Sequence, residues 1–76
     1  MVNSSDRFVI RFAVHLPPVY RTMFLAELID YHPATARELS DGSFEIVSLK
    51  SAKSVGILDA LRQEERRGAI VIEVQS

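Results

Sequence analysis

Residues 34–49 read ATARELSDGSFEIVSL, and this stretch decides the fold. An Asp-Gly pair between two extended segments is a good short-range signal for a β-hairpin. We therefore expect antiparallel strands over residues 34–39 and 43–49, joined by a tight turn at Asp41 and Gly42. The centre of the chain is predicted to be a two-stranded antiparallel unit.

A helix is expected on each side of this hairpin. Upstream, Pro18 suits the first helical position, where its missing N–H is not needed, and a helix over about residues 18–31 ends ahead of Pro33. Downstream, the hydroxyl of Ser51 can cap a second helix. Residues 66–68, which read RRG, supply a cationic last turn and a glycine stop for that helix.

Alternating apolar residues predict one further strand near each end of the chain, over residues 8–15 and 69–74. On one face of these strands the pattern places Phe8, Ile10, Phe12 and Val14, and then Ile70, Ile72 and Val74. The element order β-α-β-β-α-β predicts an α+β fold, a two-layer sandwich with both helices on one face of a mostly antiparallel sheet. Two strand orders fit this pattern. One is the ferredoxin-like order, in which the first strand lies between the third and the fourth.

Length and composition predict one small domain over residues 1–76. The absence of cysteine excludes disulfides and thiolate metal sites, and no motif predicts metal, nucleotide or other cofactor chemistry. A net charge of −1 with scattered Lys and Arg gives no electrostatic footprint for nucleic acid or an anionic membrane. Without a signal-peptide pattern or a membrane-spanning apolar run, the expected location is the cytoplasm.

Two short motifs resemble one known family. Residues 13–18 read AVHLPP, which is similar to Gly-Ile-His-Ala-Arg-Pro of the histidine-containing phosphocarrier (HPr-like) family of the bacterial sugar phosphotransferase system, with His15 and Pro18 in matching places. Residues 48–51 read SLKS and resemble the family's Asn-Leu-Lys-Ser. The resemblance spans nearly the whole chain but is specific at few positions. It implies the second strand order, an open-faced sandwich in which the first strand adjoins only the fourth.

The resemblance also implies site residues. His15 would accept a phosphoryl group from a donor enzyme, and Ser51 would be a regulatory serine modified by a kinase. A docking patch for partner enzymes or a regulatory protein would consist of Leu16, Tyr20, Arg21 and Phe24. This patch requires the first helix to turn Val19, Met23 and Ala26 inward; without the resemblance, the stripe of Tyr20, Phe24 and Leu28 is preferred for the core.

Departures from the family are part of the prediction. Pro17 replaces the family's arginine, whose guanidinium stabilises the phosphoryl charge, so the His15 site could be degenerate. The chain also lacks a counterpart of the family's third helix after its fourth strand. Because this leaves apolar surface uncovered, a homodimer through helix-face contacts is expected. The alternative function is a ferredoxin-like small-molecule-binding or dimerisation module without phosphotransfer, in which His15 and Ser51 are incidental.

Overall fold

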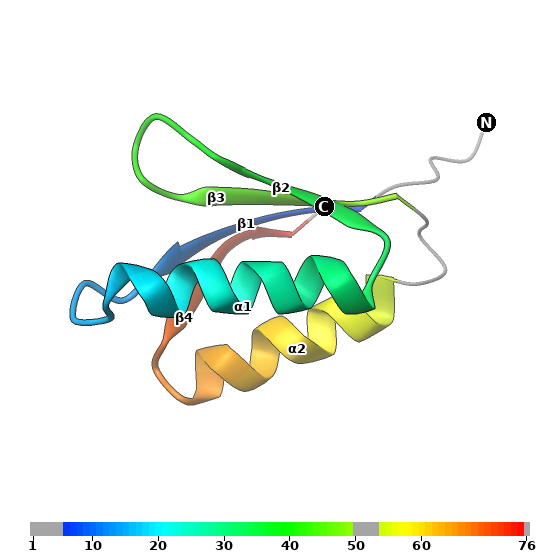
Figure 1. Cartoon of the computed structure of the whole chain (residues 1–76). Coiled ribbons are helices and arrows are strands. Elements are labelled where there is room, and N and C mark those ends of the chain that lie inside the picture. Colours follow the sequence, from blue (N-terminus) through cyan, green and yellow to red (C-terminus); the bar gives the residue numbers. More distant parts are fainter. Residues whose placement is uncertain (1–5, 50–53, 76) are drawn as a thin grey trace.

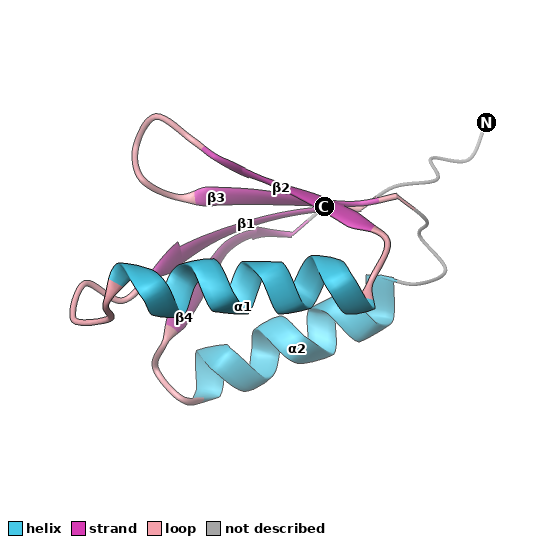
Figure 2. Cartoon of the chain, viewed as in Figure 1, coloured by secondary structure: helices cyan, strands magenta, loops and turns pink. Residues whose placement is uncertain are grey.

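The computed structural model describes residues 6–49 and 54–75 of the 76-residue chain. The elements are β1 (Arg7–Phe12), α1 (Pro18–Tyr31), β2 (Ala34–Glu38), β3 (Phe44–Ser48), α2 (Ser54–Arg66) and β4 (Ile70–Gln75). They form two layers, with α1 and α2 together on one face of the sheet (Figures 1 and 2). The predicted α+β class and the β-α-β-β-α-β order are therefore confirmed.

The four strands form one antiparallel sheet in the order β2-β3-β1-β4. β1 pairs with β3 along one side, for example Phe8 opposite Ile46, and with β4 along the other. This is the ferredoxin-like order. The chain does not adopt the HPr-like order, because β1 uses its second side to pair with β3 instead of leaving it free.

The hydrophobic core lies between the sheet and the two helices. Alternation along β1 buries Phe8, Ile10 and Phe12, while α2 buries Ile57 and Leu61 one helical turn apart. The other buried members of the core are Leu28, Ala34, Ile46, Ala69 and Ile70. Phe12 also meets two rings edge to face, with centroid distances of 6.0 Å to Phe24 and 5.5 Å to Phe44. Such pairs add about 0.5–1.5 kcal/mol each beyond their buried area.

β1 ends at Phe12, ahead of its predicted end at His15. The Ala13 N–H still donates to the carbonyl of Ala69 at 2.8 Å, but the Leu16 N–H turns back to the carbonyl of Ala13 at 3.2 Å. The chain therefore leaves the sheet in a turn. Val14, expected on the core face, is 99% exposed as a result.

β4 contains a β-bulge that sequence alternation did not reveal. Ile72 lies opposite Ile10, whereas Val74 lies opposite the adjacent residue Val9. One extra residue on β4 reverses the alternation, so Ile70 and Ile72 pack toward the helices while Val74 is 39% exposed. The prediction that Ile70, Ile72 and Val74 share one face is therefore correct for Ile70 and Ile72 and wrong for Val74.

The predicted turn and helix stop are both present. Gly42 has φ +88° in the hairpin and Gly68 has φ +79° after α2, a left-handed region that favours glycine. In the hairpin, one carboxylate oxygen of Asp41 accepts from the Ser43 hydroxyl and, at 3.0 Å, from the Ser43 N–H. These two hydrogen bonds lower the pKa of Asp41, the hydroxyl bond having the larger effect.

Candidate functional site

His15 lies in the turn between β1 and α1 and is exposed. Pro17 precedes α1 without a side-chain cap, and the Tyr20 N–H donates to the Pro17 carbonyl at 3.0 Å. The imidazole is thus just ahead of a helix N-terminus, where backbone N–H groups favour anions. Within the described part of the chain, no side chain forms a hydrogen bond or ion pair with it. His15 is accessible to a partner enzyme, but no described side chain orients its imidazole for attack on a phosphoryl group.

The patch predicted for partner docking is not an exposed surface. Leu16, Tyr20 and Phe24 are partly buried and pack against the core. The opposite stripe of α1 faces solvent instead, with Val19 61% and Met23 59% exposed. The orientation of α1 that the resemblance implied is therefore wrong. The larger aromatic stripe turns inward because it buries more apolar surface against Phe12.

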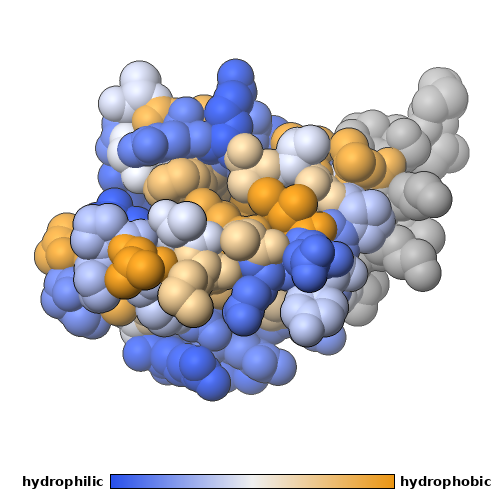
Figure 3. Space-filling view, in the orientation of Figure 1, coloured by the Kyte–Doolittle hydropathy of each residue, from blue (hydrophilic) through white to orange (hydrophobic). Residues whose placement is uncertain are grey.

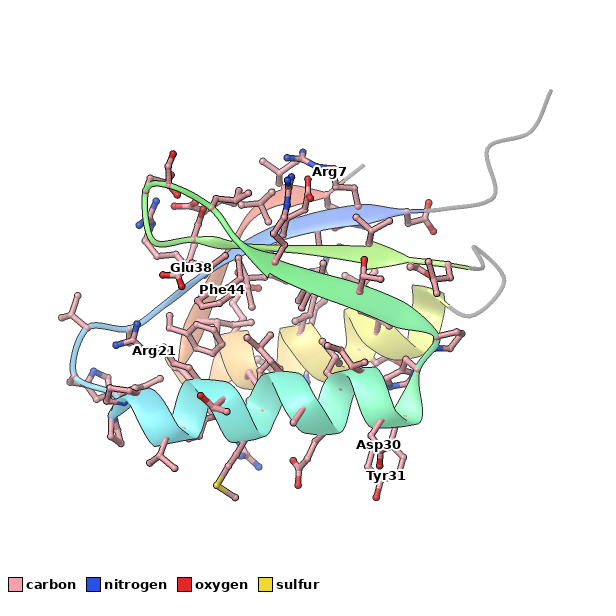
Figure 4. All side chains as sticks on the ribbon, turned by 45° about the horizontal axis from the view of Figure 1, so that its top comes forward. Arg7, Arg21, Asp30, Tyr31, Glu38 and Phe44 are labelled. Carbon is pink, nitrogen blue, oxygen red and sulfur yellow. The ribbon has the colours of Figure 1, made fainter. Side chains whose placement is uncertain are left out.

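Arg21 is the polar member of the inward side of α1. Its side chain rises from the helix toward the sheet, on the side of the hairpin end that carries Glu38 and Phe44 (Figure 4). The Nε atom is buried and finds no acceptor among the described residues. A buried donor without a partner is destabilising. Arg21 thus lies within the layer between helix and sheet rather than on a docking surface.

A polar contact links the two helices. The Tyr20 hydroxyl donates to the Glu64 carboxylate, and Arg67 approaches the other carboxylate oxygen at 3.4 Å. The hydrogen bond to Glu64, followed by burial, raises the pKa of Tyr20 because both favour the neutral phenol. The phenol therefore keeps its proton and acts as a donor that holds α1 to α2.

Next to this contact, the two helices form what we call the helix groove, made of two adjoining hollows of about 200 Å³ and 140 Å³. Phe24 and Glu27 line both hollows. The remaining lining residues are Tyr20, Met23, Glu64 and Arg67 in the larger hollow, and Leu28, Tyr31, His32 and Ala60 in the smaller one. Small-molecule sites usually enclose about 300–1,000 Å³. Each hollow is smaller than that, so neither resembles a site for a drug-sized ligand.

His32, at the end of α1, explains a glycine in α2. A Cβ atom added to Gly56 would lie 2.8 Å from Cε1 and 3.2 Å from Nδ1 of the His32 ring. Glycine lowers helix stability by up to about 1 kcal/mol relative to alanine. Gly56 therefore leaves room for the imidazole, which packs directly on the α2 backbone.

We expect the effect of Gly56→Ala to depend on His32. In a His32→Ala background, the new methyl group has space and the substitution should stabilise the chain by up to about 1 kcal/mol. In the parent, the methyl group and the ring compete for one position, so the gain should vanish or become a loss. Urea unfolding of the four variants measures this coupling. Equal effects of Gly56→Ala in both backgrounds would show that the ring does not lie on Gly56.

The sheet face that points away from the helices carries ordered ion pairs. Glu45 on β3 accepts from Arg7 on β1 and, at 2.8 Å, from Arg37 on β2. Arg7 stands on this outer face in Figure 4. Both arginines, Arg7 with the larger effect, lower the pKa of Glu45. Because exposed pairs are worth only about 0–1 kcal/mol, these contacts align neighbouring strands more than they stabilise the fold.

A second set of ion pairs spans the same face. Arg11 contacts Glu73 at 2.9 Å and Asp41 at 3.0 Å. The hydrogen bond and charge of Glu73, followed by the charge of Asp41, raise the pKa of Arg11. On this outer face of the sheet, the acidic side chains are thus paired with basic side chains of neighbouring strands or of the hairpin.

Ser51, the predicted regulatory residue, lies outside the described residues. No sequence pattern indicated the helix groove, and the only indication of the contact of His32 with Gly56 was a glycine early in a predicted helix. Within residues 6–49 and 54–75, no group of three or more His, Cys, Asp or Glu side chains could hold a metal ion. Over the same residues, neither helix is long and apolar enough to cross a membrane.

Comparisons with known proteins assign no family. A scan against family models, a search of curated proteins and a search of solved structures each found no match to this chain. Its function is therefore inferred from its own geometry.

Proposed function

We propose that this chain is a ferredoxin-like association module, which acts by binding a protein surface and not by carrying a phosphoryl group. The position of β1 between β3 and β4 carries this proposal. A sheet in which the first strand adjoins only the fourth cannot become this sheet without breaking and remaking strand pairs. The strand order thus favours the alternative function over the phosphocarrier function that the motifs around His15 and Ser51 imply.

Exposed apolar side chains support association. Among the described residues, the large apolar side chains on the surface are Val14, Val19, Met23, Ile29, Tyr31, Leu49, Val71 and Val74. Single exposed apolar residues are ordinary, whereas contiguous apolar patches mark interaction surfaces. α1 alone carries Val19, Met23, Ile29 and Tyr31. Met23 and Tyr31, two of these exposed residues, also line the helix groove.

The surroundings of His15 also support binding over phosphotransfer. The motif arginine is Pro17, and Arg21, the nearest basic residue of α1, reaches into the layer between helix and sheet. A phosphoryl group on His15 would have the backbone N–H groups of α1 beside it, but no guanidinium at the motif position.

Incubation with a phosphoenolpyruvate-dependent donor enzyme, followed by intact-mass measurement, tests this proposal. We expect no gain in mass, while a known phosphocarrier in the same reaction gains one phosphoryl group. An acid-labile adduct that is present on the parent and absent from His15→Ala would contradict the proposal and restore the phosphocarrier function. An adduct that persists in His15→Ala, or that maps to His32, would instead show phosphotransfer at a residue other than the one that the motif alignment implies.

A further inference from the structure

The free edges of the sheet, β2 and β4, differ in how they are protected. In β4, the outward N–H of Ile72 donates to the carboxylate of Glu65 from α2 at 3.2 Å, and the bulge distorts the strand. Side-chain caps and bulges are devices that prevent other strands from pairing with an edge. β2 pairs with β3 in regular register over its whole length, without a bulge.

The register of β2 shows which of its backbone groups are unpaired. The Leu39 N–H donates to the Ser43 carbonyl at 2.7 Å, and the Leu49 N–H donates to the Pro33 carbonyl at 2.8 Å. Hydrogen-bonded positions alternate in an antiparallel pair. The backbone N–H and C=O groups of Thr35 and Arg37 therefore also point toward β3 and bond to it. The N–H and C=O groups of Ala34, Ala36 and Glu38 therefore point away from the sheet. Within the described residues, none of these groups has a hydrogen-bond partner.

We propose that β2 is a homodimer interface, at which the β2 strands of two copies pair antiparallel about a two-fold axis at Ala36 and join two sheets into one. This inference rests on the proposed association function and names its partner. The axis places Ala36 opposite its own copy and Ala34 opposite Glu38 of the second copy. Every outward donor and acceptor on one β2 then meets an outward acceptor and donor on the other.

The side chains of β2 fit this pairing. Ala34 and Ala36 are small and point toward the helix layer, so two copies can approach closely on that side. On the outer face the same axis places Thr35 opposite Arg37, and each Arg37 keeps Glu45 of its own chain as a partner. Like charges do not lie directly opposite one another, which would oppose pairing.

α1 supplies apolar surface beside this edge. Its Phe24 and Tyr31 face the helix groove and Leu28 faces the core, so the 100° spacing of helical residues directs Leu25 and Ile29 to the flank over β2. Ile29 is 40% exposed there. Figure 3 shows apolar side chains gathered over α1 and β2 at the centre of this face. Pairing of β2 would bring the two copies of this flank together and bury them.

Hydrogen exchange measured over a range of protein concentrations tests the pairing directly. The amides of Ala34, Ala36 and Glu38 should exchange fast in dilute solution and become at least tenfold slower as the chain dimerises. The amides of Thr35 and Arg37, on the same strand, should stay protected at every concentration and serve as internal controls. Light scattering on the same samples gives the oligomeric state.

Three variants test the geometry. Ile29→Asp should dissociate the dimer, whereas Val19→Asp, on the solvent side of the same helix, should not. Ala36→Pro removes an N–H that the monomer does not use, and proline is accepted at such edge positions, so this variant should be a folded monomer. If Ala36→Pro fails to fold, the exchange pattern and the two α1 variants still test whether the copies pair through β2.

Several outcomes would overturn the interface. They are a monomer at all concentrations with fast outward amides, a dimer that dissociates on Val19→Asp but not on Ile29→Asp, and outward amides that are protected in a monomer. The second outcome would establish the helix-face dimer expected from the sequence. A monomer that binds another protein would refute the β2 interface and leave the association function standing, whereas phosphorylation of His15 would refute that function and leave the interface standing.

Discussion

Leu61→Ala should leave the chain largely unfolded at temperatures at which the parent is stable. Leu61 is fully buried between α2 and the sheet. Truncating such a leucine removes its transfer free energy and leaves a cavity, a loss of about 2–5 kcal/mol. At about 0.05–0.15 kcal/mol per residue, a chain this short has only about 4–11 kcal/mol in total. Thermal unfolding followed by circular dichroism should show a large fall in the midpoint relative to the parent.

Val71→Ala is the matched control for this prediction. Val71 is 57% exposed on β4, and surface substitutions of this kind change stability by about 0.5 kcal/mol or less. If Leu61→Ala and Val71→Ala unfolded at the same temperature, α2 could not be packed on the sheet as described.

Arg21→Met should stabilise the fold, which is unusual for a substitution inside a protein. The buried Nε of Arg21 has no acceptor among the described residues, and an unsatisfied buried donor costs about 1–3 kcal/mol. Methionine has similar length and helix propensity, fills the same space and removes the donor. The urea midpoint should rise accordingly.

Arg62→Met provides the comparison for Arg21→Met. Arg62 is exposed on α2 and makes one long contact, 3.5 Å, to Gln75. Its replacement should change the midpoint little. A fall in the midpoint for Arg21→Met would mean that the guanidinium is satisfied in solution and contributes to the layer between α1 and the sheet.

The sequence predicted those parts of the fold that depend on local chemistry. The Asp41-Gly42 turn, the proline start of α1 and the Gly68 stop of α2 are each determined by a few adjacent residues, and the elements they delimit lie close to the predicted bounds. The strand order depends on whether β1 pairs with β3, which lies about thirty-five residues later in the chain. No local pattern contains that information.

The buried face of α1, the bulge in β4 and the free edge of β2 were also hard to predict, because each depends on contacts between distant parts of the chain. α1 has two apolar stripes, and the choice between them follows from contacts with Phe12 and with α2, not from periodicity. The bulge in β4 and the outward groups of β2 depend on register, which alternation leaves undetermined. Resemblance at a few positions around His15 placed the imidazole at the correct junction, but it implied the wrong orientation of α1.

The cap that Glu65 places on Ile72 limits how far any assembly of this chain can grow. A sheet extended by strand addition behaves like a polymer, and polymers lengthen only when each unit has two reactive ends. With β4 closed and β2 open, the molecule has one such end, so addition stops once two copies have met. The Glu65 carboxylate, together with the bulge in β4, then separates a finite particle from an open-ended fibre.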